Sequence, residues 1–214
     1  MTAKKEISSI SNSRIYPTFE IVAIAASAGG LKALQKVLSV LPADFPVAIA
    51  IVQHLSPQYR SLMAEILNRC TGLAVKQAAV GDRLSAGNVY IAPPNHHLRV
   101  NPDGSLSLSQ AEREHFVRPA AEVLFQTVAE SYGERAIAVV LTGGDSDGEQ
   151  GVQTIKEKGG LVIAQDQETS QVFGMPSAAI NTGCVDWILP INEIPQALME
   201  LVFQGKLSII GTNK

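Results

Sequence analysis

The chain has 214 residues, 46% of them hydrophobic and 17% charged, which suits one globular domain with a substantial core. A formal net charge of −3 at pH 7 argues against a general nucleic-acid-binding protein, because such proteins usually carry a basic face. The only two cysteines, Cys70 and Cys184, form neither a disulfide framework nor a zinc-ligand motif, so we expect a reducing compartment.

The first 19 residues contain no apolar run of the kind found in signal peptides, and no later segment is long enough to span a bilayer. We therefore expect a cytoplasmic protein that does not insert directly into a membrane. Its predicted organisation is a flexible tail over residues 1–19, one globular domain over residues 20–205 and a C-terminal tail over residues 206–214.

Buried strands and amphipathic helices alternate from residue 20 onward. The run EIVAIAA, at residues 20–26, is continuously apolar, as in a strand covered on both faces. A second buried strand is predicted over residues 47–53, and a helix over residues 59–69. Between the two strands, a helix is predicted where five apolar residues recur at helical spacing: Leu31, Leu34, Val37, Leu38 and Leu41.

Residues 73–110 have a different pattern, with short apolar pieces in place of long runs. The sequence Pro-Asp-Gly at residues 102–104 is a turn signal between two such pieces. We therefore expect a β-hairpin insertion around residues 88–110.

Strand–helix alternation then resumes and continues to the end of the domain. It predicts a doubly wound α/β fold, in which helices cover both faces of a mainly parallel sheet. The predicted helices are at residues 120–133, 152–160, 176–183 and 192–205, and the predicted strands at residues 135–144, 161–166 and 185–190.

Chemically reactive side chains follow three of the buried strands. Ser27 follows the first strand, His54 the second, and Asp145 and Asp147 the strand that begins at residue 135. Active sites of parallel sheets gather at the carboxyl ends of the strands. A serine, a histidine and an aspartate are the parts of a nucleophilic triad, because the imidazole activates the hydroxyl and the carboxylate orients the imidazole.

A structural interpretation of the same residues stays open at this point. Serine is a favoured helix N-cap, and the glycines after Ser27 also suit a tight turn. Spacing alone does not choose between Asp145 and Asp147. The chain order Ser, His, Asp differs from that of α/β-hydrolases, which disfavours that fold.

Other types of site fit less well. A dinucleotide fingerprint needs three spaced glycines after the first strand, and only Gly29 and Gly30 are present. The phosphate-loop signature is missing, and the acidic residues at 145–149 lack the rest of a calcium-loop pattern. His96 and His97 have no acidic or sulfur partner at metal-ligand spacing, so we expect a solvated loop there. We expect neither a metal nor a cofactor.

Several sequence blocks together resemble the catalytic domain of bacterial chemotaxis protein-glutamate methylesterases. The resemblance covers residues 20–195. The blocks are IAASAGGLKAL, LPADFPVAIAIVQHLSP, GDRLSAGNVYIAPPNHHLRV, RPAAEVLFQTVAE, AIAVVLTGGDSDGEQG and AQDQETSQVFGMPSAAI.

The resemblance implies a role for each candidate residue. It places the nucleophile on Ser27, the general base on His54 and the orienting carboxylate on Asp147 rather than Asp145. We expect Nε2 of His54 to face the Ser27 hydroxyl. Backbone N–H groups of Ala28 and Gly144, supported by Gly29, are expected to hold the oxyanion. The family often has threonine at position 28 and commonly Met-Gly at positions 144–145. The resemblance assigns no substrate-binding residue.

The same resemblance implies an activity and partners. The expected reaction is hydrolysis of a glutamate γ-methyl ester on the methylated cytoplasmic region of a chemoreceptor-like protein, with release of methanol. Chemotaxis members of the family carry an N-terminal receiver domain, which residues 1–19 are too few to encode. We therefore expect a free-standing or excised esterase domain, with a separate response regulator or methyltransferase as a candidate partner.

Three alternatives remain. Deamidation of receptor glutamines would use the same acyl chemistry, with ammonia as the leaving group. A non-catalytic signalling scaffold would keep the fold without needing all three polar residues. A nucleotide-binding domain of Rossmann type is the most distant alternative.

Overall fold

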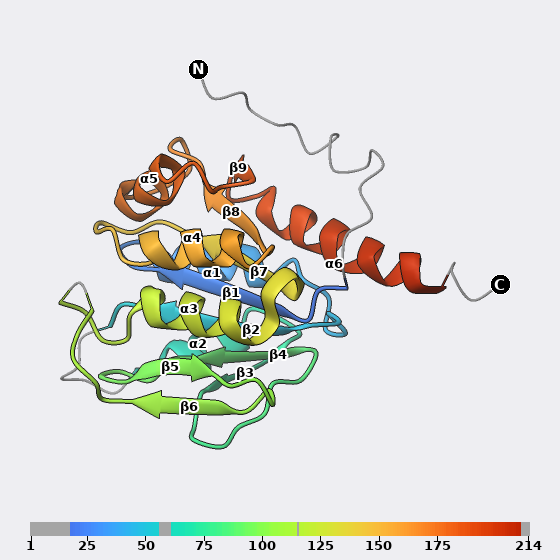
Figure 1. Cartoon of the computed structure of the whole chain (residues 1–214), viewed down its shortest axis with the longest axis horizontal. Helices are drawn as coiled ribbons and strands as arrows, with labels where there is room; N and C mark the ends of the chain where they lie inside the picture. Colours follow the sequence, from blue (N-terminus) through green and yellow to red (C-terminus); the bar gives the residue numbers. More distant parts are fainter. Residues whose placement is uncertain (1–17, 56–60, 115, 211–214) are drawn as a thin grey trace.

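The structure is a computed structural model that describes residues 18–55, 61–114 and 116–210 (Figure 1). Its main element is a seven-stranded sheet in the order β3-β4-β2-β1-β7-β8-β9, in which every neighbouring pair is parallel. The strands are β1 (Ile21–Ala26), β2 (Ala48–Gln53), β3 (Ala74–Gln77), β4 (Asn88–Ile91), β7 (Ala136–Val140), β8 (Leu161–Gln165) and β9 (Trp187–Leu189).

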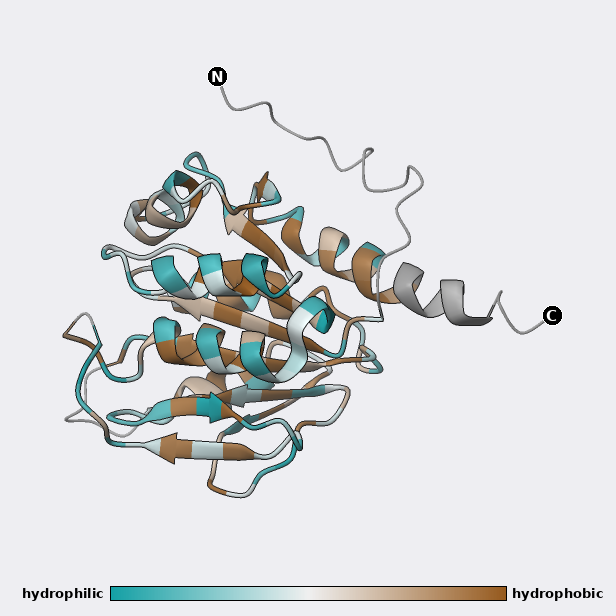
Figure 2. Cartoon of the chain, viewed as in Figure 1, coloured by the Kyte–Doolittle hydropathy of each residue, from teal (hydrophilic) through white to brown (hydrophobic). Residues whose placement is uncertain are grey.

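Helices cover both faces of this sheet, which confirms the predicted doubly wound α/β fold. One hydrophobic cluster joins the sheet to α1 (Gly30–Leu38), α2 (Met63–Asn68) and α6 (Ile194–Ile210). A second cluster joins the opposite face to α3 (Ala121–Tyr132), α4 (Glu149–Glu157) and α5 (Gly174–Asn181). In Figure 2 strands β1 and β8 of the main sheet are largely hydrophobic, whereas the outward sides of α3 and α4 are hydrophilic.

Side chains of unequal size line the two faces of β1. Val22 and Ile24 point toward α1 and α6, while Ala23 and Ala25 lie in the cluster that contains α3. Successive side chains of a strand alternate between faces. Small alanine side chains on the α3 face let that helix lie close to the sheet.

The predicted hairpin is narrower than residues 88–110. It consists of β5 (His97–Val100) and β6 (Leu106–Ser109), which pair antiparallel and form a separate two-stranded sheet. The preceding segment, β4, instead pairs in parallel with β2 and β3 in the main sheet. Val89, Tyr90 and Ile91 are all buried, as is usual for a strand of a parallel sheet that is covered on both faces.

The ends of the chain differ in detail from the predicted boundaries. Phe19, the last residue of the expected N-terminal tail, is 1% exposed and belongs to the core. At the other end, α6 continues past residue 205. The predicted helix over residues 59–69 is described only in part and appears as α2. Among the described residues, no helix combines the length and the apolar composition needed to cross a lipid bilayer.

The register of the central strands places their carboxyl ends side by side. Ala26 at the end of β1 pairs with Gln53 at the end of β2, and Ala25 pairs with Val140 at the end of β7. The residues that follow these three strands therefore meet at one edge of the sheet.

Candidate active site

Ser27 lies in the turn between β1 and α1. Its N–H donates to the Thr142 carbonyl at 2.9 Å, and its own carbonyl accepts from the Gly30 N–H at 2.9 Å. The N-cap of α1 is Gly29, with φ 80°, and no side chain caps this helix. The Ser27 hydroxyl is therefore not used as a helix cap.

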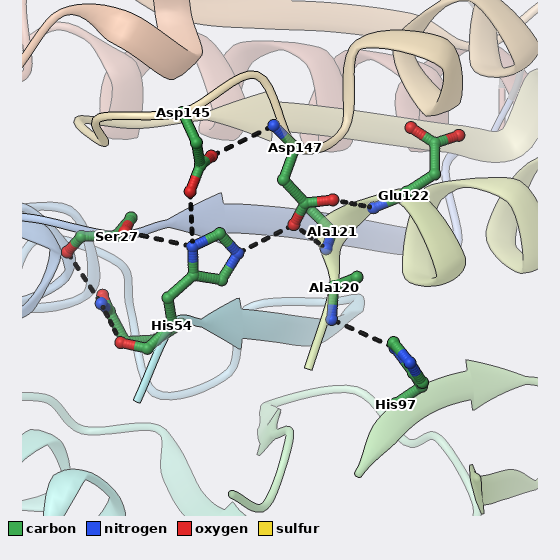
Figure 3. A network of polar contacts seen from close by, with 9 residues as sticks. Ser27, His54, His97, Ala120, Ala121, Glu122, Asp145 and Asp147 are labelled. Carbon is green, nitrogen blue, oxygen red and sulfur yellow. Dashed lines mark hydrogen bonds and ion pairs between the residues drawn. The ribbon is translucent and has the colours of Figure 1, made fainter. Parts of the chain in front are cut away.

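The His54 ring connects Ser27 to Asp147 (Figure 3). Nδ1 of His54 lies 3.1 Å from Ser27 Oγ, and Nε2 lies 2.8 Å from Asp147 Oδ2. The prediction that Nε2 faces Ser27 is therefore wrong. Neighbouring strands are about 4.8 Å apart, so the ring nitrogen nearer the backbone reaches Ser27, which directly follows β1. The far nitrogen reaches Asp147, which follows β7 on the other side of β1.

Either ring nitrogen of a neutral imidazole can accept a hydrogen bond while the other donates one. When the neutral imidazole carries its proton on Nε2, it donates to Asp147. The lone pair of Nδ1 then accepts from the Ser27 hydroxyl. The two ring nitrogens exchange the roles that were expected, and the hydroxyl still faces a base.

Asp147 is buried at the start of α3. Its Oδ2 accepts the Ala121 N–H, and its Oδ1 accepts the Glu122 N–H at 3.1 Å. The first N–H groups of a helix have no partner within the helix, and the helix dipole favours a negative charge there. The helix terminus thus compensates the buried carboxylate and fixes its position against His54.

Asp145 also contacts the imidazole. Its Oδ2 lies 3.2 Å from His54 Nδ1, and its Oδ1 accepts the Asp147 N–H at 3.1 Å. The two aspartates that the spacing did not separate thus lie on different ring nitrogens. Burial alone would lower the pKa of His54, but the contacts with Asp145 and Asp147 outweigh it and raise this pKa to about 9.

Gln53 is a site residue that the sequence analysis did not single out. It is buried, and its Nε2 donates to the carbonyls of Ser27 at 2.7 Å and His54 at 3.1 Å. A Cβ on Gly30 would lie 2.0 Å from Gln53 Oε1, so glycine is required where α1 begins. The one signal in the sequence was a glutamine at the end of an apolar strand.

His97 begins β5 and contacts the backbone at the start of α3. The expectation of a solvated loop is wrong for this residue. It is 1% exposed, because the β5–β6 hairpin folds back over the helix. Its Nδ1 accepts the Ala120 N–H at 3.2 Å, and its Nε2 donates to the Glu112 carbonyl at 2.9 Å. His96 is half-buried and contacts the Pro94 carbonyl at 3.0 Å. The described part of the chain contains no cluster of residues suited to bind a metal.

Of the expected oxyanion donors, Ala28 directly follows Ser27, and Gly144 follows Gly143 in the loop after β7. Within the described ranges, the N–H groups of Ala28 and Gly144 have no hydrogen-bond partner, whereas the Gly143 N–H donates to the Val172 carbonyl. A Cβ on Gly143 would lie 2.9 Å from the Ser27 Cβ. Glycine at this position therefore allows the loop after β7 to approach Ser27 closely.

An open cavity of about 200 Å³ lies beside His54. It is formed mainly by the segment that precedes α3. Its lining residues are His54, Leu55, Arg113, Phe116, Val117, Arg118 and Pro119. The cavity therefore adjoins the imidazole that contacts Ser27 Oγ.

Comparison with known proteins gives consistent matches. A family model described as CheB methylesterase matches residues 22–198. The crystal structure of the Thermotoga maritima CheB methylesterase catalytic domain superimposes with a TM-score of 0.83 at 40% identity, covering 86% of this chain and 99% of that one.

Three relatives show how much of each protein this chain covers. A Leptospira interrogans relative is 39% identical, and the alignment covers 86% of this chain and 95% of the relative. A Pyrococcus horikoshii protein-glutamate methylesterase/protein-glutamine glutaminase is 41% identical over 85% of this chain. The Myxococcus xanthus protein-glutamate methylesterase FrzG is 41% identical over 87%. The chain spans 50% and 56% of the length of these last two relatives.

Proposed function

Because the chain belongs to the CheB methylesterase family, we propose that it hydrolyses glutamate γ-methyl esters on a chemoreceptor-like protein and releases methanol. The observation that carries this proposal is the hydrogen-bonded chain from Ser27 through His54 to Asp147. It joins a nucleophile, a base and a buried carboxylate at the ends of three neighbouring strands.

The first half of the reaction forms an acyl-enzyme. Ser27 Oγ attacks the ester carbonyl while His54 Nδ1 takes the hydroxyl proton. Asp147 stabilises the resulting imidazolium through Nε2–H. The tetrahedral oxyanion is held by the N–H groups of Ala28 and Gly144, in the turn that Gly29 shapes. Collapse of this intermediate breaks the bond to methoxide, which takes the proton from His54 and leaves as methanol.

The second half of the reaction regenerates the enzyme. His54 takes a proton from water, which attacks the acyl carbonyl and releases a free glutamate side chain together with the Ser27 hydroxyl. General acid–base catalysis of this kind contributes about 10²–10⁴-fold, and each oxyanion donor about 10²–10³-fold. No step needs a group other than the protein and water.

Deamidation of glutamine is a second candidate, because the Pyrococcus horikoshii relative carries protein-glutamine glutaminase in its name. The same acyl-enzyme would form, and His54 would protonate the amide nitrogen, which leaves as ammonia. The proposed partner of both reactions is the cytoplasmic region of a receptor, with the protein itself in the cytoplasm. A separate response regulator or methyltransferase is the proposed source of control.

Methanol release from methylated receptor preparations tests the proposal. Ser27→Ala should lower turnover by about 10³-fold or more, because the nucleophile is lost, while the unfolding transition stays in place. Ser39→Ala is the matched control, since Ser39 is exposed at the end of α1. A fluorophosphonate should label the parent protein but not Ser27→Ala. Equal turnover by Ser27→Ala and the parent protein would overturn the mechanism.

A further inference from the structure

Two oxygen atoms approach the same nitrogen of His54. Nδ1 lies 3.1 Å from Ser27 Oγ and 3.2 Å from Asp145 Oδ2 (Figure 3). Asp145 is held in this place because its other oxygen accepts the Asp147 N–H. Its side chain is 37% exposed, so the contact is at the solvent edge of the site.

One nitrogen cannot serve both partners in the same protonation state. To activate Ser27, Nδ1 must offer a lone pair, and that lone pair then faces the negative Asp145 carboxylate. When Nδ1 carries a proton, it donates to the carboxylate and can no longer accept the proton of Ser27. A nearby negative charge favours the protonated ring, so the Asp145 contact opposes the catalytic state of His54.

We propose that Asp145 is a positioning residue that acts through His54, holding a proton on Nδ1 and so restraining the activation of Ser27 at neutral pH. The kinetic part of this inference rests on the proposed function. The protonation of His54 does not, and it can be measured without any substrate.

Charged groups on the other elements around His54 do not reverse this effect. Asp147 adds a second negative charge at Nε2, from the same loop as Asp145. The buried Glu122 lies at the start of α3. Arg113 and Arg118 line the adjoining cavity and act in the opposite direction.

The Arg118 side chain also forms hydrogen bonds with groups other than His54. Its guanidinium donates to Asn95 and to the Gln110 and Ala111 carbonyls. The contacts with Asp145 and Asp147 therefore prevail over burial, and the pKa of His54 is raised as described above.

Asp145→Asn separates the effect of the negative charge from that of the hydrogen bond to the Asp147 N–H. The amide oxygen of asparagine can still accept the Asp147 N–H, while the negative charge next to Nδ1 is removed. Glu149→Gln is the control, because it removes the same charge at the nearby start of α4.

The direct measurement is the titration of the His54 ring by NMR in the Ser27→Ala background. The midpoint should fall by about one unit or more when Asp145→Asn is added, toward the ordinary histidine value of about 6.5. Glu149→Gln should shift it far less. An unchanged midpoint in Asp145→Asn would overturn the inference, whatever the activity of the protein.

The kinetic measurement is the rate of fluorophosphonate labelling of Ser27 between pH 6 and 10. Each unit by which the His54 midpoint falls should raise labelling at pH 7 about tenfold, because the neutral fraction of the ring rises tenfold. Labelling at pH 10 should not rise. A uniform loss at every pH would indicate a merely structural role and would overturn the inference. Faster labelling without hydrolysis of a methyl ester would support the role of Asp145 and overturn the proposed function.

Discussion

The side-chain amide of Gln53 donates to the backbone carbonyl of Ser27 at 2.7 Å, across the boundary between β2 and β1. The same amide donates to the carbonyl of His54. One buried side chain thus ties together the backbone of the proposed nucleophile and that of its base. The distance between Ser27 and His54 depends on this tie as well as on the sheet.

Gln53→Leu should therefore lower the kcat of the folded protein as well as the free energy of unfolding. Leucine fills a similar volume but removes the amide donor from the His54 carbonyl and leaves the Ser27 carbonyl with the Gly30 N–H alone, which costs about 1–3 kcal/mol. We expect the unfolding free energy to fall by that amount and kcat to fall about tenfold, measured by denaturant titration and methanol release. Gln77→Leu, on the exposed edge strand β3, is the control. An unchanged kcat in Gln53→Leu would show that the tie does not position the site.

Alanine substitutions of the neighbouring residues His96 and His97 should have very different effects on the free energy of unfolding and on kcat. His97→Ala removes the acceptor of the Ala120 N–H and leaves a buried cavity, so it should cost about 2–4 kcal/mol of unfolding free energy. It should also lower kcat, because the start of α3 holds Asp147. His96→Ala should have little effect on either quantity. Similar losses in the two variants would contradict the buried supporting role of His97.

Stability should fall as the pH rises from neutral to alkaline. The pKa of His54 is about 9 in the folded protein and about 6.5 in the unfolded chain, so the folded state binds more protons between these values. The contribution of His54 is complete below about pH 6.5 and is lost as the pH rises through about 9. The unfolding free energy of the parent protein and of His54→Gln should therefore differ more at pH 6 than at pH 10. A constant difference would contradict the raised pKa.

The strands that carry the site could be predicted because each is a continuous apolar run with a polar residue directly after it. The run at residues 47–53, for example, corresponds to β2, and His54 follows both. By contrast, β4 has only four residues, and its assignment to the main sheet depends on pairing with β2, which local sequence does not encode.

The details of the site depend on contacts between distant segments. Which nitrogen of His54 faces Ser27 follows from the position of β1 between β2 and β7, and strand order is not readable from apolar runs. The burial of His97 requires the hairpin to fold over α3. Residue type and position therefore indicated which groups meet, but not how they face one another.

The parallel register of β1 and β2 has a consequence for how this scaffold tolerates change. Ser27 and His54 each stand one residue beyond the matched pair of Ala26 and Gln53. Deleting one residue within β2 would exchange the faces of all side chains that follow it in the strand. The imidazole would then turn away from the hydroxyl even if every residue type were kept. The number of residues in β2 therefore constrains the site more than the residue types within the strand do, and redesigned versions of this domain should keep that number.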